Sequence, residues 1–559
     1  MKYYRKYYKD CPPEITIERI KQILRNIGIE IEVLCRINEF GYYSARVRVT
    51  NNPFNKFNIG TNGKGRNQEF AIASALAEFM ERLQNHILFR GNLLQSSKYA
   101  KYIKQHQLQF VYSANEQFSK YSTNTYLQTL NKYFPNSTTR IPFIEAKDIY
   151  VIEVPFTNMI TNEIEMLPLS LIRRMVGTTG MCAGNSKAEA IVQGINEICE
   201  RYILHTIFCR RCDFPTINLY DFIGTPIYST IKSLSKYYNI SVKDCSLGGK
   251  FPVVGISIID NNKNSFTFKL GADYSLYTAI ERCLSELFQG RECLDPLLKP
   301  IDFSYTPSIQ DYYDCLNNGD GIYPSWLIIA STNKSQFPYK SYGSYETELN
   351  DYCRMLNSIG YDVFVRDCSY LEYPSYHIYI PGLSDLRYPL FDIAEQINYL
   401  GLFDNGIEPF LNVNNFSTLQ AKSYLSIAGF SKILKINAWN TSENNIMYNN
   451  YFEFLLAASI QDYTMASSKL KQFISCIENS GLKCAKLIRE SAKEIFNYLS
   501  NPPQLNGKDD ILLSLGINAY PACPNCDACQ VKHQCYYNIF IDFQNHLCDI
   551  NKRYYYEHQ

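Results

Sequence analysis

Three segments of this chain carry polar side chains at matching positions. They are SALAEFMER at 74–82, QGINEICER at 193–201 and RCLSELFQG at 282–290. Their first, fifth and eighth positions hold Ser74, Glu78 and Glu81; Gln193, Glu197 and Glu200; and Arg282, Glu286 and Gln289. Side chains three and four residues apart share one face of an α-helix. Each segment is therefore predicted to form a helix with a polar stripe and an apolar face that is buried.

The first two stripes each contain a pair of neighbouring carboxylates followed by an arginine, Arg82 or Arg201. Burying such pairs is costly unless a cation neutralises them. Mg²⁺ takes oxygen ligands and leaves positions for substrate phosphates, which arginine and lysine also bind. We therefore expect a site for Mg²⁺ and a nucleoside triphosphate. The alternative is that these are solvated helix faces with Glu–Arg pairs, each worth roughly a few tenths of a kcal/mol.

Glycine-rich stretches precede the first two stripes. They are GTNGKG at 60–65 and GMCAGNSKAEA at 180–190. We interpret both as loops that lead into helices, where free backbone N–H groups suit an anion. Neither matches the P-loop pattern, so the expected nucleotide site is of another kind.

Composition limits the class of protein. The 559 residues have a net charge of +1, 46% hydrophobic and 19% charged residues, which indicates a folded chain without electrostatic attraction to nucleic acid or membranes. The start has no continuous apolar segment, and no apolar run reaches about 18 residues, so we expect neither a secretory signal nor a membrane span. Nineteen cysteines without a signal favour reduced thiols in the cytoplasm.

The chain is predicted to have an α+β fold with three regions. Residues 1–390 combine a first helix at PPEITIERIKQILRN, the three striped helices, and strands such as EVLCRI, YYSARVRV, IYVIEV, FPVVGISII and SFTFKL. Residues 391–505 contain amphipathic helical patterns with short connections. Residues 506–559 are a cysteine-rich C-terminal segment.

Several of these motifs, in this order, resemble the YcaO family. They are TNGKG with SALAEFMER, GMCAGN with VQGINEICER, SLGGKFPV, ERCLSELFQGR and YIPGLSDLRYP. The resemblance is closest to the family's stand-alone type and covers about two thirds of the chain. It implies a YcaO-type ATP- and Mg²⁺-binding domain followed by a smaller tetratricopeptide-like helical region. It also implies an enzyme that activates a backbone amide by phosphorylating its oxygen.

The resemblance also implies roles for individual residues. Glu78, Glu81, Glu197 and Glu200 would be Mg²⁺ ligands, and no catalytic residue is assigned. Lys64 is added for its position in the glycine-rich stretch. The ATP-binding residues would be Lys9, Lys64, Ser74, Asn185, Gln193, Arg201, Arg282 and Glu286. Two positions depart from the stand-alone type: Cys182 replaces a serine, and Glu69 replaces a lysine, which removes one phosphate contact.

Four cysteines lie close together near the C-terminus, in CPNCDACQVKHQC. They are Cys523, Cys526, Cys529 and Cys535. C-x-x-C spacing suits tetrahedral Zn²⁺, and the overlapping repeat also resembles iron–sulfur ligation. We predict a Zn²⁺ or iron–sulfur site here. A second pair, Cys209 and Cys212, and His205 on the preceding helix are interpreted as structural.

Three functions remain open. The resemblance first implies an accessory factor for β-methylthiolation of an aspartate in a small-subunit ribosomal protein. The second is a peptide maturase that forms azolines or thioamides, and the third is a non-catalytic metal-bearing scaffold. We expect a peptide or protein substrate, a radical or sulfur-donor partner protein and a homodimer.

Overall fold

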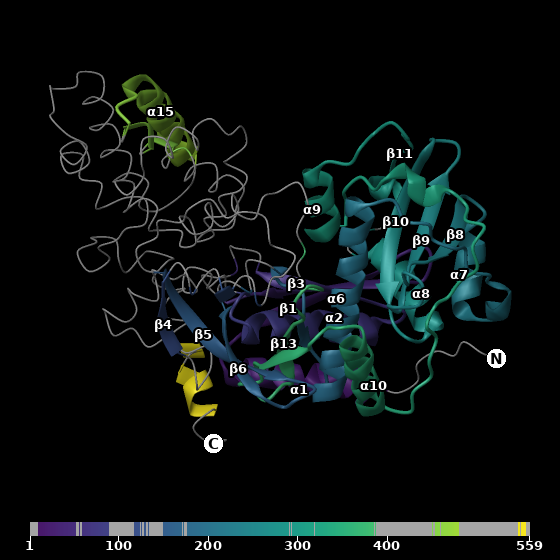
Figure 1. The fold of residues 1–559 in the computed structure, drawn as a ribbon, viewed down its shortest axis with the longest axis horizontal. Helices are drawn as coiled ribbons and strands as arrows, with labels where there is room; N and C mark the ends of the chain where they lie inside the picture. Colours follow the sequence, from purple (N-terminus) through teal and green to yellow (C-terminus); the bar gives the residue numbers. More distant parts are fainter. Residues whose placement is uncertain are drawn as a thin grey trace.

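A computed structural model of the 559-residue chain describes its first two thirds most completely. The described residues are 9–51, 55, 59–88, 117–122, four single residues between 125 and 132, 149–169, 172, 176–289, 291, 293–317, 319–384, 386, 450, 453–454, 456–458, 460–479, 546–547 and 549–554. Within them, helices and antiparallel sheets are interleaved along the chain, which confirms the predicted α+β class (Figure 1).

The first layer is a three-stranded antiparallel sheet, in the order β1-β2-β3, covered by two helices. Its core is formed by apolar side chains such as Ile20, Val47 and Phe79, all fully buried. Leu547, near the C-terminus, packs into this same core. The elements are α1 (Pro13–Asn26), β1 (Ile31–Ile37), β2 (Tyr43–Val49), β3 (Gly60–Gly65) and α2 (Gln68–Gln84).

The stretch GTNGKG was expected to be a loop and is instead strand β3, so that interpretation was wrong. It pairs with β2, placing Gly63 opposite Ala45. The glycines allow α2 to approach the strand closely, since a Cβ on Gly63 would lie 2.2 Å from the carbonyl oxygen of Ala71. The missing side chains thus serve helix–strand packing rather than a turn.

A four-stranded sheet, in the order β11-β10-β9-β8, forms a second body. Helices α7 and α8 pack with residues of β8 and β9 in one hydrophobic cluster, and α6 packs with residues of β10 in another. The elements are α7 (Pro226–Leu234), β8 (Asn239–Asp244), β9 (Val253–Asp260), β10 (Ser265–Ala272), α8 (Leu276–Phe288) and β11 (Lys299–Pro300).

Helix α6 (Lys187–Cys209) contacts strands of two different sheets. It packs on β10 and on β13 and β7 of a third, six-stranded sheet, while α9 and α10 cover it (Figure 1). That sheet and the remaining helices comprise β4 (Gln117–Tyr121), β5 (Ile149–Asn158), β6 (Ile164–Pro168), β7 (Met181–Ala183), α9 (Ile309–Asn317), α10 (Tyr345–Ser358), β12 (Phe364–Asp367), β13 (Ser375–Tyr379) and α15 (Tyr463–Asn479).

The three striped segments are helices, as predicted, and each begins at a polar cap. The side chains of Asn67, Ser186 and Ser275 accept hydrogen bonds from backbone N–H groups three residues later at the starts of α2, α6 and α8. The apolar faces of the three helices lie in three separate hydrophobic clusters. Their polar stripes are left to face a space between these clusters.

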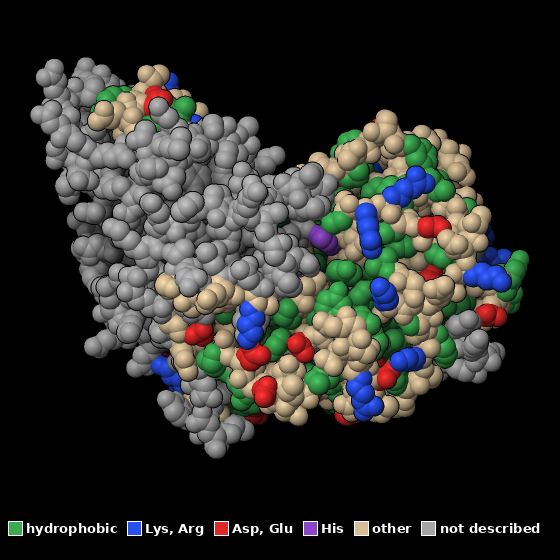
Figure 2. All heavy atoms as spheres, in the orientation of Figure 1, with side chains coloured by type: hydrophobic (Ala, Val, Ile, Leu, Met, Phe, Trp, Pro, Cys, Tyr) green, Lys and Arg blue, Asp and Glu red, His purple; other side chains and the backbone are tan. Residues whose placement is uncertain are grey.

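Helix α15 confirms one of the predicted C-terminal helices, whereas most of residues 391–505 lie outside the described part. The domain boundaries stay predictions. On the described surface in Figure 2, Lys and Arg side chains are interspersed with Asp and Glu, in keeping with the small net charge.

Candidate functional site

One cavity of about 1240 Å³ lies where the three striped helices meet. Every residue predicted to bind ATP or Mg²⁺ lines it. They come from the N-terminal segment, β3, α2, the turn after β7, α6 and α8: Lys9, Lys64, Ser74, Glu78, Glu81, Asn185, Gln193, Glu197, Glu200, Arg201, Arg282 and Glu286. The structure therefore brings together residues that are far apart in the sequence.

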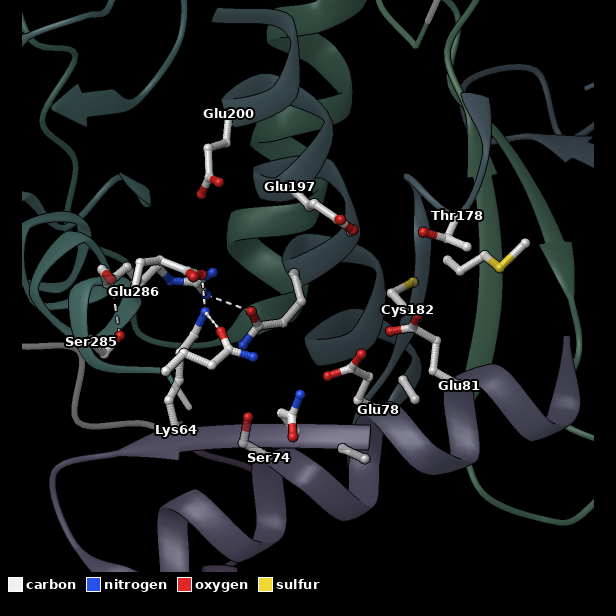
Figure 3. Close-up of a pocket in the computed structure, with 18 of the residues that line it drawn as sticks. Lys64, Ser74, Glu78, Glu81, Thr178, Cys182, Glu197, Glu200, Ser285 and Glu286 are labelled. Atoms are coloured by element: carbon white, nitrogen blue, oxygen red, sulfur yellow. Dashed lines mark hydrogen bonds and ion pairs between the residues drawn. The ribbon is translucent and has the colours of Figure 1, made fainter. Parts of the chain in front are cut away.

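Two walls of the cavity carry the paired carboxylates. Glu78 and Glu81 project from α2, and Glu197 and Glu200 from α6 (Figure 3). Burial raises the pKa of Glu78, Glu81 and Glu200, and the charge on Glu197 raises each of them further. For Glu81 the rise is well above the ordinary value. The negative charge of these four glutamates is thus not fully neutralised by nearby cationic side chains.

Each pair has an arginine beside it. Arg82 lies 3.7 Å from Glu78 and 3.4 Å from Glu81, and Arg201 lies 3.8 Å from Glu197. Burial alone would lower the pKa of both arginines, but the neighbouring glutamates more than offset it and raise the pKa overall. One arginine against two carboxylates on each helix leaves net negative charge.

These side chains do not converge on one point as they stand. Among the residues that the structure describes, no three His, Cys, Asp or Glu side chains are close enough together to hold a metal ion. The donor chemistry nevertheless fits Mg²⁺, because carboxylate oxygens are its preferred protein ligands. Burial, and to a smaller extent the charge on Glu197, raises the pKa of Glu81 and Glu200, and a bound cation would favour their charged forms.

The third wall, from α8 and β3, carries cations. Arg282 donates to the side-chain oxygen of Gln193 and lies 4.0 Å from Asp273. Lys64 forms an ion pair with Glu286 and donates to Gln289 at 3.0 Å (Figure 3). Burial lowers the pKa of Lys64 to about 8, despite the attraction of Glu200.

Glu189 was missed by the sequence reasoning. Its carboxylate is buried in the first turn of α6, where it accepts hydrogen bonds from Lys9 at 3.1 Å and from Asn185 at 3.2 Å. Thr16 donates to the other end of Asn185 at 2.6 Å. Two predicted ATP-binding residues are thus held in place by a third that the pattern did not single out.

The structure describes both residues that depart from the family pattern, Cys182 and Glu69. The Cys182 thiol is buried and donates to the carbonyl oxygen of Tyr376 at 3.7 Å, and burial raises its pKa well above the ordinary value. Glu69 lies in the first turn of α2 and is not among the residues that line the cavity. Neither change removes a predicted Mg²⁺ ligand.

The predicted Zn²⁺ or iron–sulfur site at Cys523, Cys526, Cys529 and Cys535 lies outside the described residues.

His205 packs edge-on against Tyr312, and burial lowers its pKa to about 4, in agreement with a structural role. No cysteine in the described part of the chain forms a disulfide. Its helices are also too short or too polar to cross a bilayer.

Comparison with known proteins places these features in a family. The profile of the family described as "YcaO cyclodehydratase, ATP- and Mg²⁺-binding" matches residues 62–384, more than half of the chain. An uncharacterized protein of Haemophilus influenzae is 27% identical over 70% of this chain and 68% of its own. The ribosomal protein S12 methylthiotransferase accessory factor of Escherichia coli K12 is 26% identical over the same shares.

Among solved structures, the chain matches that of YcaO from Methanopyrus kandleri bound with AMPPCP and Mg²⁺, with 15% identity and a TM-score of 0.43. The match covers 67% of this chain and 92% of that one.

Proposed function

This chain belongs to the YcaO family, and we propose that it is an ATP- and Mg²⁺-dependent enzyme that phosphorylates the oxygen of a backbone amide in a peptide or protein. One observation carries this proposal. Carboxylates on α2 and α6 and cations on β3, α6 and α8 line a single cavity, although their helices belong to three separate cores. A Mg²⁺-bound triphosphate has the charge pattern that such walls complement.

In this proposal Glu78, Glu81, Glu197 and Glu200 hold Mg²⁺. The metal would neutralise both the carboxylates and the charge that develops on the phosphates. The phosphate oxygens would lie against Lys64, Arg201 and Arg282. Other polar residues that line the cavity would complete the nucleotide site: Lys9, Ser74, Asn185, Gln193 and Glu286. Phosphoryl transfer depends mostly on such positioning.

In the proposed reaction, the amide oxygen bonds to the γ-phosphorus as the bond from that phosphorus to ADP breaks, and ADP leaves. A nucleophile loses its proton and adds to the carbonyl carbon. Inorganic phosphate then departs with the former amide oxygen, and ring formation also releases the amide N–H proton. A Cys, Ser or Thr side chain as nucleophile yields an azoline, and external sulfide yields a thioamide. No described residue is assigned as the base in this scheme.

For the biological role we propose an accessory factor in β-methylthiolation of a small-subunit ribosomal protein, supported by the accessory factor among the relatives. The second candidate is a peptide maturase, which the cyclodehydratase description of the family favours. A radical or sulfur-donor partner, a homodimer, a cytoplasmic location and the C-terminal metal site stay predictions. A non-catalytic scaffold is the outcome if ATP does not bind.

Calorimetric titration of ATP in the presence of Mg²⁺ tests the nucleotide site. Glu78→Gln and Glu200→Gln should each weaken binding by about tenfold or more, because a charged contact is worth roughly 1.5–3 kcal/mol. Glu32→Gln is the control, since Glu32 lies on β1 and pairs with Arg48 away from the cavity. Unchanged binding in both cavity variants would place the nucleotide elsewhere.

The biological role needs a separate test. Ribosomal protein S12 from cells with and without this gene is compared by mass spectrometry. Loss of the β-methylthio mass from the aspartyl peptide supports the accessory role. An unchanged peptide removes it and leaves the maturase, for which a precursor-peptide gene would lie beside this one.

A further inference from the structure

Two cationic residues that are not among the predicted nucleotide-binding residues also line the cavity, and one of them is buried. Lys269 lies on β10, on the same face as Gly271, which packs against α8. Only 6% of Lys269 is exposed. Arg291 follows shortly after the end of α8, and both residues line the cavity.

The turn after α9 presents a peptide-like pair of groups to these cations. Lys269 donates to the backbone carbonyl oxygen of Gly319, and Arg291 forms an ion pair with the carboxylate of Asp320. Gly319 has a φ of +68°, and a Cβ there would lie 2.5 Å from the Lys269 nitrogen. Glycine at this position therefore permits the close contact between the lysine and the backbone.

The positive charges around Lys269 are close to one another. Burial, with a smaller effect from the charges on Arg291 and Arg201, lowers the pKa of Lys269 to about 8. Asp320 is the carboxylate that pairs with Arg291, and its side chain is 49% exposed. The exposure of the Asp320 carboxylate limits the free energy that its pair with Arg291 contributes, so the carboxylate of a bound peptide could take its place.

We propose that Lys269 and Arg291 recognise an acidic residue of the peptide substrate, Arg291 through the carboxylate of that residue and Lys269 through the backbone carbonyl of the residue before it. Residues 319–320 occupy this subsite in the free protein and leave it when the peptide binds. The inference rests on the proposed function for the presence of a peptide substrate. It adds the class of peptide, which must carry an aspartate or glutamate beside the cavity cations.

The geometry of the turn explains why a peptide is favoured over free phosphate. Its two groups are the neutral carbonyl of Gly319 and the carboxylate of Asp320, and an acidic residue together with the residue before it carries the same two groups in a peptide. The planar guanidinium of Arg291 suits a carboxylate, and the ammonium of Lys269 donates to any single oxygen.

The test uses two neutral-ended tripeptides, N-acetyl-Gly-Asp-Gly-amide and its Asn counterpart. Their affinities for the full-length protein with Mg²⁺ and a non-hydrolysable ATP analogue are measured by NMR titration. The Asp peptide should bind about tenfold more tightly, in line with a charged hydrogen bond. Asp320→Asn should raise its affinity several-fold, because the competing carboxylate is removed.

Substitution of the two cationic residues should affect peptide binding differently. Arg291→Gln should abolish the preference for Asp over Asn, whereas Lys269→Met should weaken both peptides alike. Lys299→Gln is the matched control, since Lys299 is on the neighbouring strand β11 and also donates to a backbone carbonyl, that of Pro296, but outside the cavity. Melting temperatures of all variants check that they fold.

Two results would overturn the inference. Equal binding of both peptides by the wild type and Asp320→Asn would mean that the Asp320–Arg291 pair only fixes the turn. If inorganic phosphate displaced the Asp peptide at concentrations below those at which the peptide binds, the subsite would be assigned to phosphate. Calorimetry with Mg²⁺ and ATP is run in parallel, so that a failure of nucleotide binding is recognised separately from a failure of peptide selection.

Discussion

Glu81 on α2 and Glu197 on α6 repel each other across the cavity, and the charge on Glu197 helps to raise the pKa of Glu81. Each side chain also has an arginine neighbour on its own helix. The repulsion therefore acts between two helices whose apolar faces are anchored in different cores. In the absence of a bound cation, the two walls are held together against their own charge.

Replacing Glu81 should have opposite effects on the free and the liganded protein. Glu81→Gln removes a carboxylate that is only 14% exposed, so we expect the melting temperature in EDTA to rise by about 2–4 °C, equivalent to roughly 1 kcal/mol. The further rise caused by Mg²⁺ and ATP in the wild type should be lost. Differential scanning calorimetry measures both, with Glu32→Gln as the exposed control. A lower melting temperature in EDTA would show that Glu81 stabilises the free protein.

The free protein should become more stable as the pH falls. Glu78, Glu81 and Glu200 have pKa values above the ordinary 4.5, so the folded state binds more protons than the unfolded state from about 4.5 up to each raised value. Their destabilising effect is fully present above the raised values and is relieved on acidification toward 4.5. Urea unfolding in EDTA at several pH values measures this slope. Mg²⁺ with ATP should reverse it, because ligands must be deprotonated.

Lys64 should contribute to ATP binding but not to the fold. Lys64→Gln is expected to weaken ATP binding by about tenfold, as a charge-assisted contact is lost, with little change in melting temperature. Arg48→Gln is the control, because Arg48 lies on β2, which pairs with β3, and its partner Glu32 is outside the cavity. Equal ATP affinities for the two variants would remove Lys64 from the site.

A methyl group at Gly63 should destabilise the first layer. The Cβ of Gly63→Ala would lie 2.2 Å from the oxygen of Ala71 and 2.3 Å from the nitrogen of Ala75, so α2 must move away from β3. We expect a loss of about 1–3 kcal/mol in unfolding free energy. Gly343→Ala provides the matched control, since nothing lies within 4 Å of its added methyl group. Similar unfolding curves for the two variants would contradict the close packing.

Helical periodicity predicted which side chains share a face on α2, α6 and α8, because those side chains repeat on single helices. The registers of Glu78 with Glu81 and of Glu197 with Glu200 are local properties, and local spacing is what a sequence displays directly. The convergence of three stripes on one cavity is not local. It depends on how α2, α6 and α8 pack on three sheets, and only the family resemblance anticipated it.

One interpretation was wrong for a physical reason. The glycines of GTNGKG were interpreted as a loop, although their small size serves the approach of α2 to β3. The strand prediction for SFTFKL did not indicate where Lys269 lies. Helix α8 covers its face of the sheet, and Lys269 lines the cavity. Strand alternation indicates that two faces differ, but not that the polar face is exposed.

The assignment of α2, α6 and α8 to three separate hydrophobic clusters has a consequence for cooperativity. A nucleotide that touches all three helices would couple the opening of units that otherwise fluctuate with some independence. Hydrogen exchange in the three clusters would then slow together on binding, including at amides far from the ligand. In such a protein, the affinity for ATP would depend on how well the three clusters hold α2, α6 and α8 in their relative positions.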